Sequence, residues 1–120
     1  MRASLALLTL FFCSLSPGAE TNKAQILFFT AAWCAPCHKI RPQVAELAKK
    51  YKVALVLVDF DASPRAVEDF QVQSLPTIVL LDSGGRLRVR IEGANRQAID
   101  ALASALKALA SSRGGSRKRG

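Results

Sequence analysis

The segment Gln25–His38, QILFFTAAWCAPCH, decides the fold. Its first six residues, Gln25–Thr30, form a largely apolar run that is typical of a strand buried on both faces of a sheet. Beyond Pro36 the apolar residues recur every three or four positions, which predicts a helix; they are Ile40, Val44, Leu47, Ala48 and Tyr51. The sequence therefore predicts a strand that runs into a helix, with two cysteines at the junction.

A second strand and a short helix are predicted next. Val53–Val58, VALVLV, is a second apolar run, and we expect it to be a buried strand. Ser63 and Pro64 then combine a helix-capping residue with a proline suited to the first helical position. The short helix that follows carries Val67 and Phe70.

The last part of the chain predicts a hairpin and a helix. Thr77–Leu81 is apolar, Asp82–Gly85 has turn composition, and Arg86–Ile91 alternates between polar and apolar residues. This pattern predicts two antiparallel strands, the second half-exposed. Asn95 is a good cap for a final helix, whose apolar face comprises Ile99, Leu102, Ala103, Leu106 and Leu109.

These elements define an α/β fold class. The predicted order is β-α-β-α-β-β-α, in which a helix joins the first two strands into a parallel unit and the last two strands form a hairpin. A four-stranded mixed sheet with helices on both faces follows. The chain has 120 residues, enough for one small domain, which we place at residues 20–110.

The N-terminal residues have the layout of a secretory signal peptide. Arg2 is followed by an uncharged run, Leu5–Leu15, and by the small residues of Ser16–Ala19. This pattern predicts a leader over residues 1–19 and an exported protein, periplasmic or extracellular. The run is short for a membrane span, so no stable membrane insertion is expected after its removal. An uncleaved anchor and a buried strand remain alternatives.

The C-terminal residues 111–120, SSRGGSRKRG, are rich in Gly, Ser and basic residues, and we expect a disordered basic tail. The whole chain has 17 Lys and Arg against 9 Asp and Glu, a net charge of +8. Much of that excess lies in the two ends, at Arg2, Arg113, Arg117, Lys118 and Arg119. The bulk charge therefore does not indicate a nucleic-acid partner.

The cysteine pair carries the chemistry. Cys34 and Cys37 flank Ala35-Pro36 where a strand gives way to a helix. Because the first turn of a helix has unpaired N–H groups and a positive dipole end, we expect a lowered pKa for Cys34. Cys34 is the exposed candidate nucleophile, and Cys37 lies one turn further on, where it can close a disulfide. We expect Trp33 to lie against the site and shield it.

These residues resemble a known family. Trp33–Cys37 with Pro42 is similar to the active-site helix of thioredoxin, with alanine at position 35 where the family usually has glycine. Leu75-Pro76-Thr77 resembles the second family motif, and Gly93 falls on a family glycine near the site. The resemblance covers residues 24–110 and implies a trimmed thioredoxin-like fold.

Roles follow from the resemblance. It implies that Cys34 is the attacking thiol, that Cys37 is the resolving thiol, and that the two form the redox disulfide. It also implies that Pro76 is a cis proline facing the cysteines and that Leu75 offers its backbone to a substrate peptide. The substrate groove is thus predicted to comprise Trp33, Pro36, Leu75, Pro76 and Gly93.

Two positions depart from the family pattern. Phe28 stands where thioredoxins usually have a buried aspartate, and Leu57 stands where they have a lysine. That pair is thought to help deprotonate the resolving cysteine. Here solvent, or Asp59 or Asp61 reaching in, would have to serve. Once the predicted leader is removed, too little of the chain remains before Gln25 for the family's first strand and helix.

The cysteine spacing also fits other uses. Cys34–His38 fits the C-x-x-C-H pattern of haem attachment, but the only methionine that could be a second axial ligand is Met1,. A closed zinc site needs four ligands, and two cysteines and one histidine remain after residue 19, so no metal is predicted. A structural disulfide within a non-catalytic binding module is the main alternative. His38 itself is expected to be an exposed residue that adds positive charge near Cys34 at low pH.

The sequence thus predicts a protein thiol–disulfide oxidoreductase without cofactors. We expect a monomer that acts on protein disulfides and needs a membrane-bound or soluble redox partner. Arg86, Arg88 and Arg90 would share one face of an edge strand. Protection of that edge by charge is the simplest explanation, and attraction of acidic substrates is the alternative.

Overall fold

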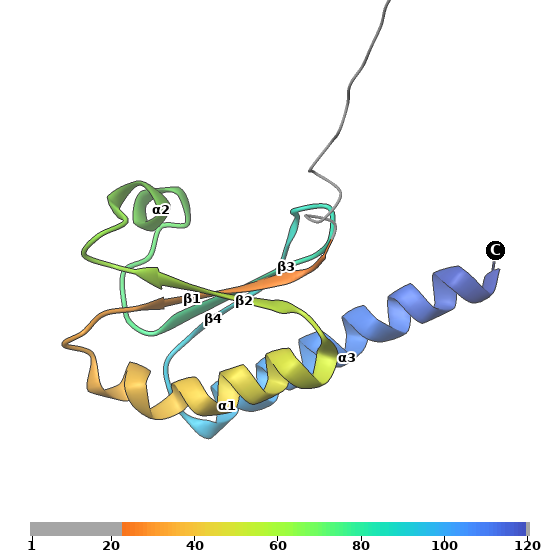
Figure 1. The fold of residues 1–120 in the computed structure, drawn as a ribbon, viewed down its shortest axis with the longest axis horizontal. Helices are drawn as coiled ribbons and strands as arrows, with labels where there is room; N and C mark the ends of the chain where they lie inside the picture. The colour runs from red at the N-terminus through yellow and green to blue at the C-terminus, as the bar shows by residue number, and fades with distance from the viewer. Residues whose placement is uncertain (1–22, 120) are drawn as a thin grey trace, which may run out of the picture.

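The structure, a computed structural model, describes residues 23–119, with side chains described for residues 23–112. It contains four strands and three helices in the predicted order (Figure 1). They are β1 (Gln25–Thr30), α1 (Ala35–Tyr51), β2 (Ala54–Asp59), α2 (Pro64–Asp69), β3 (Thr77–Leu81), β4 (Leu87–Glu92) and α3 (Arg96–Arg119). The α/β fold class predicted from the sequence is confirmed.

The sheet is mixed and has the strand order β2-β1-β3-β4. β1 pairs in parallel with β2, with Gln25 opposite Ala54, and antiparallel with β3, with Phe29 opposite Thr77. β3 and β4 form the predicted antiparallel hairpin. Because β1 is an inner strand with partners on both sides, its backbone groups are satisfied within the sheet.

The helices cover the two faces of the sheet unequally. α1 and α3 lie together on one face, and α2 lies on the other (Figure 1). Alternate β1 residues point to the two faces, as strand geometry requires. Ile26 and Phe28 therefore join the core beneath α1 and α3, whereas Leu27 and Phe29 join a smaller core with Val72 and Val79 on the α2 side.

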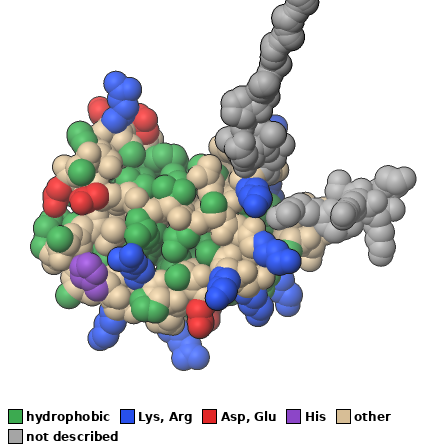
Figure 2. Space-filling model, viewed as in Figure 1, with side chains coloured by type: hydrophobic (Ala, Val, Ile, Leu, Met, Phe, Trp, Pro, Cys, Tyr) green, Lys and Arg blue, Asp and Glu red, His purple; other side chains and the backbone are tan. Residues whose placement is uncertain are grey.

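The predicted burial of the second strand is wrong. β2 is an edge strand, and Val56 and Leu57 keep 37% and 42% of their surface exposed. Figure 2 shows hydrophobic side chains at the centre of the face on which β2 lies in Figure 1, with Lys and Arg along its lower and right-hand parts. An apolar run indicates that a segment forms a strand, but it does not indicate whether the strand lies inside the sheet or at its edge. At an edge the strand has no neighbour on one side, so its side chains stay partly exposed.

The sequence predicted a leader at the N-terminal end of the chain and a disordered tail at the C-terminal end. The predicted leader at residues 1–19 is outside the described residues. The backbone of α3 continues to Arg119, where the sequence predicted a disordered tail from residue 111. Lys and Arg are good helix formers but glycine is a poor one, so the composition of this segment, which includes Gly114 and Gly115, does not explain the continued helix. Within the described residues, none of the helices is both long enough and apolar enough to cross a membrane.

The β3–β4 turn is organised by Asp82. Its Oδ1 accepts hydrogen bonds from the backbone N–H groups of Gly84 and Arg86, each at 2.9 Å. The hydrogen bond from Arg86, with smaller help from Gly84 and the nearby arginines, holds the pKa of Asp82 below its ordinary value,. Gly85 has a φ of +83°, a conformation that glycine adopts without steric cost.

We predict that Leu102→Ala will destabilise the protein by about 2–5 kcal/mol, because Leu102 is fully buried between α3 and the sheet,. Leu87→Ala, at a leucine that is 51% exposed, is the matched control and should cost about 0.5 kcal/mol. Urea denaturation measures both. Equal losses for the two variants would contradict the packing of α3 described above.

Candidate active site

The two cysteines lie at the β1–α1 junction. They are joined by a disulfide, with their Cα atoms 5.3 Å apart. β1 ends at Thr30 and α1 begins at Ala35, so the connecting loop is only four residues long. The central strand of the sheet therefore sets the position of Cys34, because little backbone separates them.

Cys34 is the N-cap residue of α1. Its backbone is extended, with φ −94° and ψ 97°, and the Cys37 N–H donates to Cys34 Sγ at 3.3 Å. Pro36 lies in the first turn, where its missing N–H leaves no helical hydrogen bond unmade,. A helix N-terminus and a backbone donor both favour a negative charge on this sulfur. This geometry agrees with the expectation that the strand–helix junction stabilises a thiolate at Cys34.

Cys34 is less accessible than the sequence predicted. Cys34 was expected to be exposed, but only 4% of its surface reaches solvent, and Cys37 has none exposed. The reason is tertiary: neighbouring loops form walls around Cys34. Cys34 is still the more accessible of the two, since Cys37 faces the core beneath α1.

A groove runs past Cys34. It is lined by Trp33, Cys34, Pro36, Phe60, Gln73, Ser74 and Leu75. The Leu75–Pro76 peptide bond is cis, as the resemblance implied. Gly93, which has a φ of +107°, donates its N–H to the Pro76 carbonyl at 3.0 Å. Of the five predicted groove residues, Trp33, Pro36 and Leu75 line the groove, whereas Pro76 and Gly93 are not among its lining residues and are connected to it through Leu75.

Three groove residues were missed in the sequence. Phe60 follows β2, and Gln73 and Ser74 precede Leu75. None belongs to a motif, and each comes to the groove through the folding of a loop. The one sequence feature that could have indicated Gln73 and Ser74 as groove residues is that they directly precede Leu75-Pro76.

Trp33 forms a wall of the groove that also contains Cys34. It is 64% exposed, and its Nε1 donates to Asp61 Oδ2 at 2.8 Å. Its ring meets that of Phe60 edge to face, with centroids 6.4 Å apart. Two partners from the loop after β2 therefore hold the indole in place.

No carboxylate described in residues 23–112 is seen to contact Cys37. Phe28, fully buried, belongs to the same core as Cys37, and Leu57 is partly exposed at the sheet edge. Asp61 is exposed and bonded to Trp33, and its own N–H donates to Asp59 Oδ1 at 2.9 Å. Neither aspartate is seen to take the place of the family's buried acid.

His38 is exposed, as predicted. Its Nε2 lies 3.1 Å from the Ala32 carbonyl oxygen. A carbonyl can only accept, so Nε2 must be the protonated ring nitrogen in this contact. His38 thereby links the first turn of α1 to the loop that precedes Cys34.

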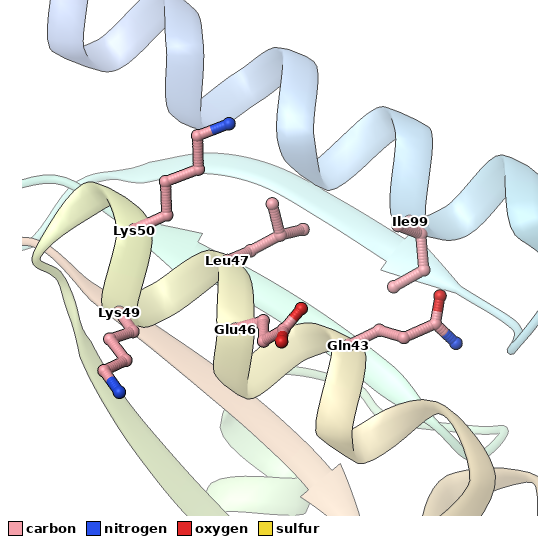
Figure 3. A pocket seen from close by; sticks show the side chains of 6 residues that line it. All are labelled: Gln43, Glu46, Leu47, Lys49, Lys50 and Ile99. Atoms are coloured by element: carbon pink, nitrogen blue, oxygen red, sulfur yellow. The ribbon is translucent and has the colours of Figure 1, made fainter.

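The remaining surface offers less chemistry. Among the described side chains, no group of three His, Cys, Asp or Glu residues is arranged to hold a metal ion. A hollow between α1 and α3 is lined by Gln43, Glu46, Leu47, Lys49, Lys50 and Ile99 (Figure 3). It lies on the outer surface of the two helices and includes neither cysteine.

The fold and the cysteine site define a class of protein. Two cysteines separated by two residues lie at a helix N-terminus, beside a cis proline and an apolar groove. This arrangement is suited to thiol–disulfide exchange. The Thioredoxin family model matches residues 18–108. The chain belongs to the thioredoxin family and is a thioredoxin-type thiol–disulfide oxidoreductase.

Relatives agree with this assignment. Thioredoxin H2 of Arabidopsis thaliana is 36% identical over 90 residues, covering 74% of this chain and 67% of the relative. An H-type thioredoxin of Fagopyrum esculentum is 40% identical over 78 residues, covering 64% of this chain and 66% of the relative. The chain thus spans about two thirds of the length of these relatives. The crystal structure of mitochondrial thioredoxin 3 from Saccharomyces cerevisiae superposes with a TM-score of 0.64 at 34% identity, covering 73% and 80% of the two chains.

The predicted localisation is corrected by these relatives. The sequence predicted an exported, periplasmic or extracellular protein from residues 1–19. The plant relatives named above are H-type thioredoxins, which are cytosolic. The family match also begins at residue 18, inside the predicted leader. An uncharged run after a basic residue is a compositional pattern, and it does not by itself distinguish a leader from other apolar segments.

Proposed function

We propose that the protein reduces disulfides of other proteins, with Cys34 as attacking and Cys37 as resolving thiol. The observation that carries this proposal is Cys34 at the N-cap of α1, with the Cys37 N–H directed at its sulfur. This environment stabilises a thiolate, which is the nucleophile in exchange. Thioredoxins act on protein disulfides as small monomers, and we extend that behaviour to this chain.

The exchange runs in two steps that start from the dithiol. The Cys34 thiolate attacks one sulfur of a substrate disulfide; the Cys34–substrate bond forms, the substrate S–S bond breaks, and the leaving thiolate takes up a proton. Cys37 then loses its proton and attacks Cys34 Sγ, which releases the second substrate thiol. Two electrons and two protons pass to the substrate, and the Cys34–Cys37 disulfide remains. A dithiol donor outside this chain must reduce it again.

We propose that the substrate peptide binds in the groove beside Cys34. Its wall of Trp33 and Phe60 is apolar, and its other side is the segment that ends at Leu75. An extended peptide that lies between these walls brings its disulfide to Cys34, the groove cysteine. We assign the backbone of Leu75 to hydrogen bonding with this peptide, because the segment before the cis proline borders the groove directly,.

The direction of electron flow is tested by the reduction potential. A reductase of this family should have a midpoint near −270 mV, the value typical of thioredoxin. Equilibration in graded dithiothreitol or glutathione buffers, followed by thiol alkylation, measures it. A midpoint near −120 mV, as in strong protein oxidants, would contradict the reductive direction and indicate a disulfide donor.

The two cysteine roles predict different variants. Cys34→Ser should abolish turnover of insulin disulfides by dithiothreitol-reduced protein, because no attacking sulfur remains. Cys37→Ser should accumulate a mixed disulfide with the substrate, visible by non-reducing electrophoresis and mass spectrometry, because the resolving sulfur is missing. Trapping on Cys37 in the Cys34→Ser variant, with turnover retained, would reverse the assignment.

The apolar surroundings of Cys37 predict a distinctive pH profile. Phe28 belongs to the same core as Cys37, and no carboxylate contact is described there, so Cys37 must deprotonate without a buried acid to accept its proton. The rate of resolution should therefore rise about tenfold per pH unit through the neutral range, with a single inflection. Stopped-flow Trp33 fluorescence after mixing with a small disulfide measures this step.

Asp59→Asn is the control for that profile. Asp59 contacts the Asp61 backbone and is not seen to contact Cys37, so this variant should leave the profile unchanged. A second inflection between about pH 5 and 7 that disappears in Asp59→Asn would identify that carboxylate as the base.

A further inference from the structure

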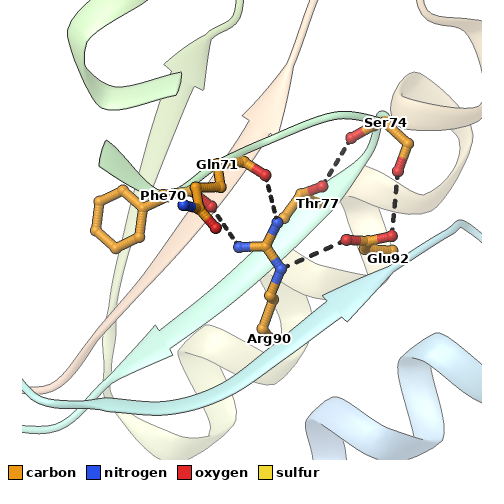
Figure 4. Close-up of polar contacts among 6 residues, drawn as sticks. All are labelled: Phe70, Gln71, Ser74, Thr77, Arg90 and Glu92. Atoms are coloured by element: carbon orange, nitrogen blue, oxygen red, sulfur yellow. Dashed lines mark hydrogen bonds and ion pairs between the residues drawn. The ribbon is translucent and has the colours of Figure 1, made fainter. Parts of the chain in front are cut away.

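We propose that Arg90, with Glu92, is a positioning residue that sets the groove wall formed by residues 70–76. The proposal rests on the reductase function proposed above. Arg90 was one of three arginines predicted to share a face of an edge strand, where charge protection explained all three. The structure separates Arg90 from the others, because its side chain is only 30% exposed and is directed at the loop after α2 (Figure 4).

The guanidinium of Arg90 binds the end of α2. Nη1 donates to the Phe70 carbonyl, Nη2 donates to the Gln71 carbonyl at 2.7 Å, and Nε donates to Glu92 Oε2 at 3.4 Å. The planar arrangement of these donors suits simultaneous binding of several acceptors, which lysine cannot reproduce. Arg90 is therefore bonded to two consecutive backbone groups of another element and also to a neighbour on its own strand.

Those two carbonyls need an outside partner. α2 ends in a Schellman motif: the Gln71 N–H donates to the Glu68 carbonyl at 3.0 Å, and the Val72 N–H donates to the Val67 carbonyl at 2.9 Å,. Gln71 has a φ of +50°, which a residue other than glycine adopts at a steric cost. The motif leaves the carbonyls of residues 70 and 71 free, and Arg90 supplies donors to both.

The same strand holds the rest of the segment. Ser74 Oγ donates to Glu92 Oε1 at 3.4 Å, and the Gly93 N–H donates to the Pro76 carbonyl at 3.0 Å. Thr77, fully buried, donates its hydroxyl to the Ser74 carbonyl at 2.7 Å. From residue 70 to residue 76, β4 and its continuation thus bind the segment at its start, middle and end.

The other side of this segment is the groove. Gln73, Ser74 and Leu75 face the cavity that contains Trp33 and Cys34. A shift of this wall would alter the fit of a peptide without moving the cysteines, which are anchored by β1 and α1. Arg90 should therefore affect the binding of protein substrates and leave the chemistry of the sulfurs unchanged.

The test compares large and small substrates. Arg90→Gln should raise KM for insulin disulfides about fivefold with kcat within about twofold of the parent. Its rate with 2-hydroxyethyl disulfide, too small to span the groove, and its reduction potential should not change. Amide hydrogen exchange of residues 72–75 should become faster, whereas that of α3 should not.

The matched control is Arg88→Gln. Arg88 lies two residues earlier on β4, at the register shift between β3 and β4, and pairs with Asp82 in the hairpin turn at 3.4 Å. It borders a hollow with Leu109 and Ser112 of α3, whereas Arg90 is directed at the end of α2, so the predicted common face of the arginines is wrong for this pair. The Arg88→Gln variant should leave KM for insulin unchanged. An equal KM for Arg90→Gln and the parent, or an equal rise in Arg88→Gln, would overturn the proposal, as would parallel losses on both substrates.

A conservative variant covers the case in which Arg90→Gln does not fold. Arg90→Lys keeps the charge but loses the planar set of donors, so KM for insulin should rise less than in Arg90→Gln, with the small-disulfide rate unchanged. An unchanged KM in folded Arg90→Lys would reject positioning by the guanidinium. The parent protein separates the two proposals: its failure to turn over either disulfide would reject the reductase function itself.

Discussion

The fold depends on the burial of β1 at the centre of the molecule. This strand is hydrogen-bonded to β2 on one side and β3 on the other, and it contributes Ile26 and Phe28 to one core and Leu27 and Phe29 to the other. It is therefore held by both its backbone and its side chains. Cys34 follows this strand after a short loop and begins α1, so the best-anchored element of the protein also sets the position of the reactive sulfur.

The active site combines two kinds of structure. The cysteines lie between two regular elements, which fixes their relation to each other and to the helix N-terminus. The groove is made from loops, with Trp33 held by Asp61 and Phe60 on one side and the segment before Pro76 held from β4 on the other. Different parts of the chain therefore position the reactive sulfurs and the walls of the substrate groove. For this reason Arg90 can affect substrate binding without affecting the cysteines.

Departures from the usual family pattern concern proton transfer and the sheet edge. Phe28 adds an apolar side chain to the core that also contains Cys37, at the position where the family places an acid,. The resolving thiol therefore has no described carboxylate partner. Leu57 and Val56 expose apolar surface on β2. A strand that is hydrogen-bonded on one side only keeps unpaired backbone groups along its outer edge.

Much was decided by local sequence. The apolar run at 25–30, the helical spacing after Pro36 and the turn at 82–85 determined the order of the elements, because periodicity and turn chemistry act over neighbouring residues. The Cys34–Cys37 spacing and Leu75-Pro76-Thr77 indicated the chemistry. Only the tertiary structure decided that 53–58 lies at an edge, that Cys34 is nearly buried and that Arg90 binds the end of α2. Those features depend on contacts between segments far apart in the chain, which no local pattern encodes.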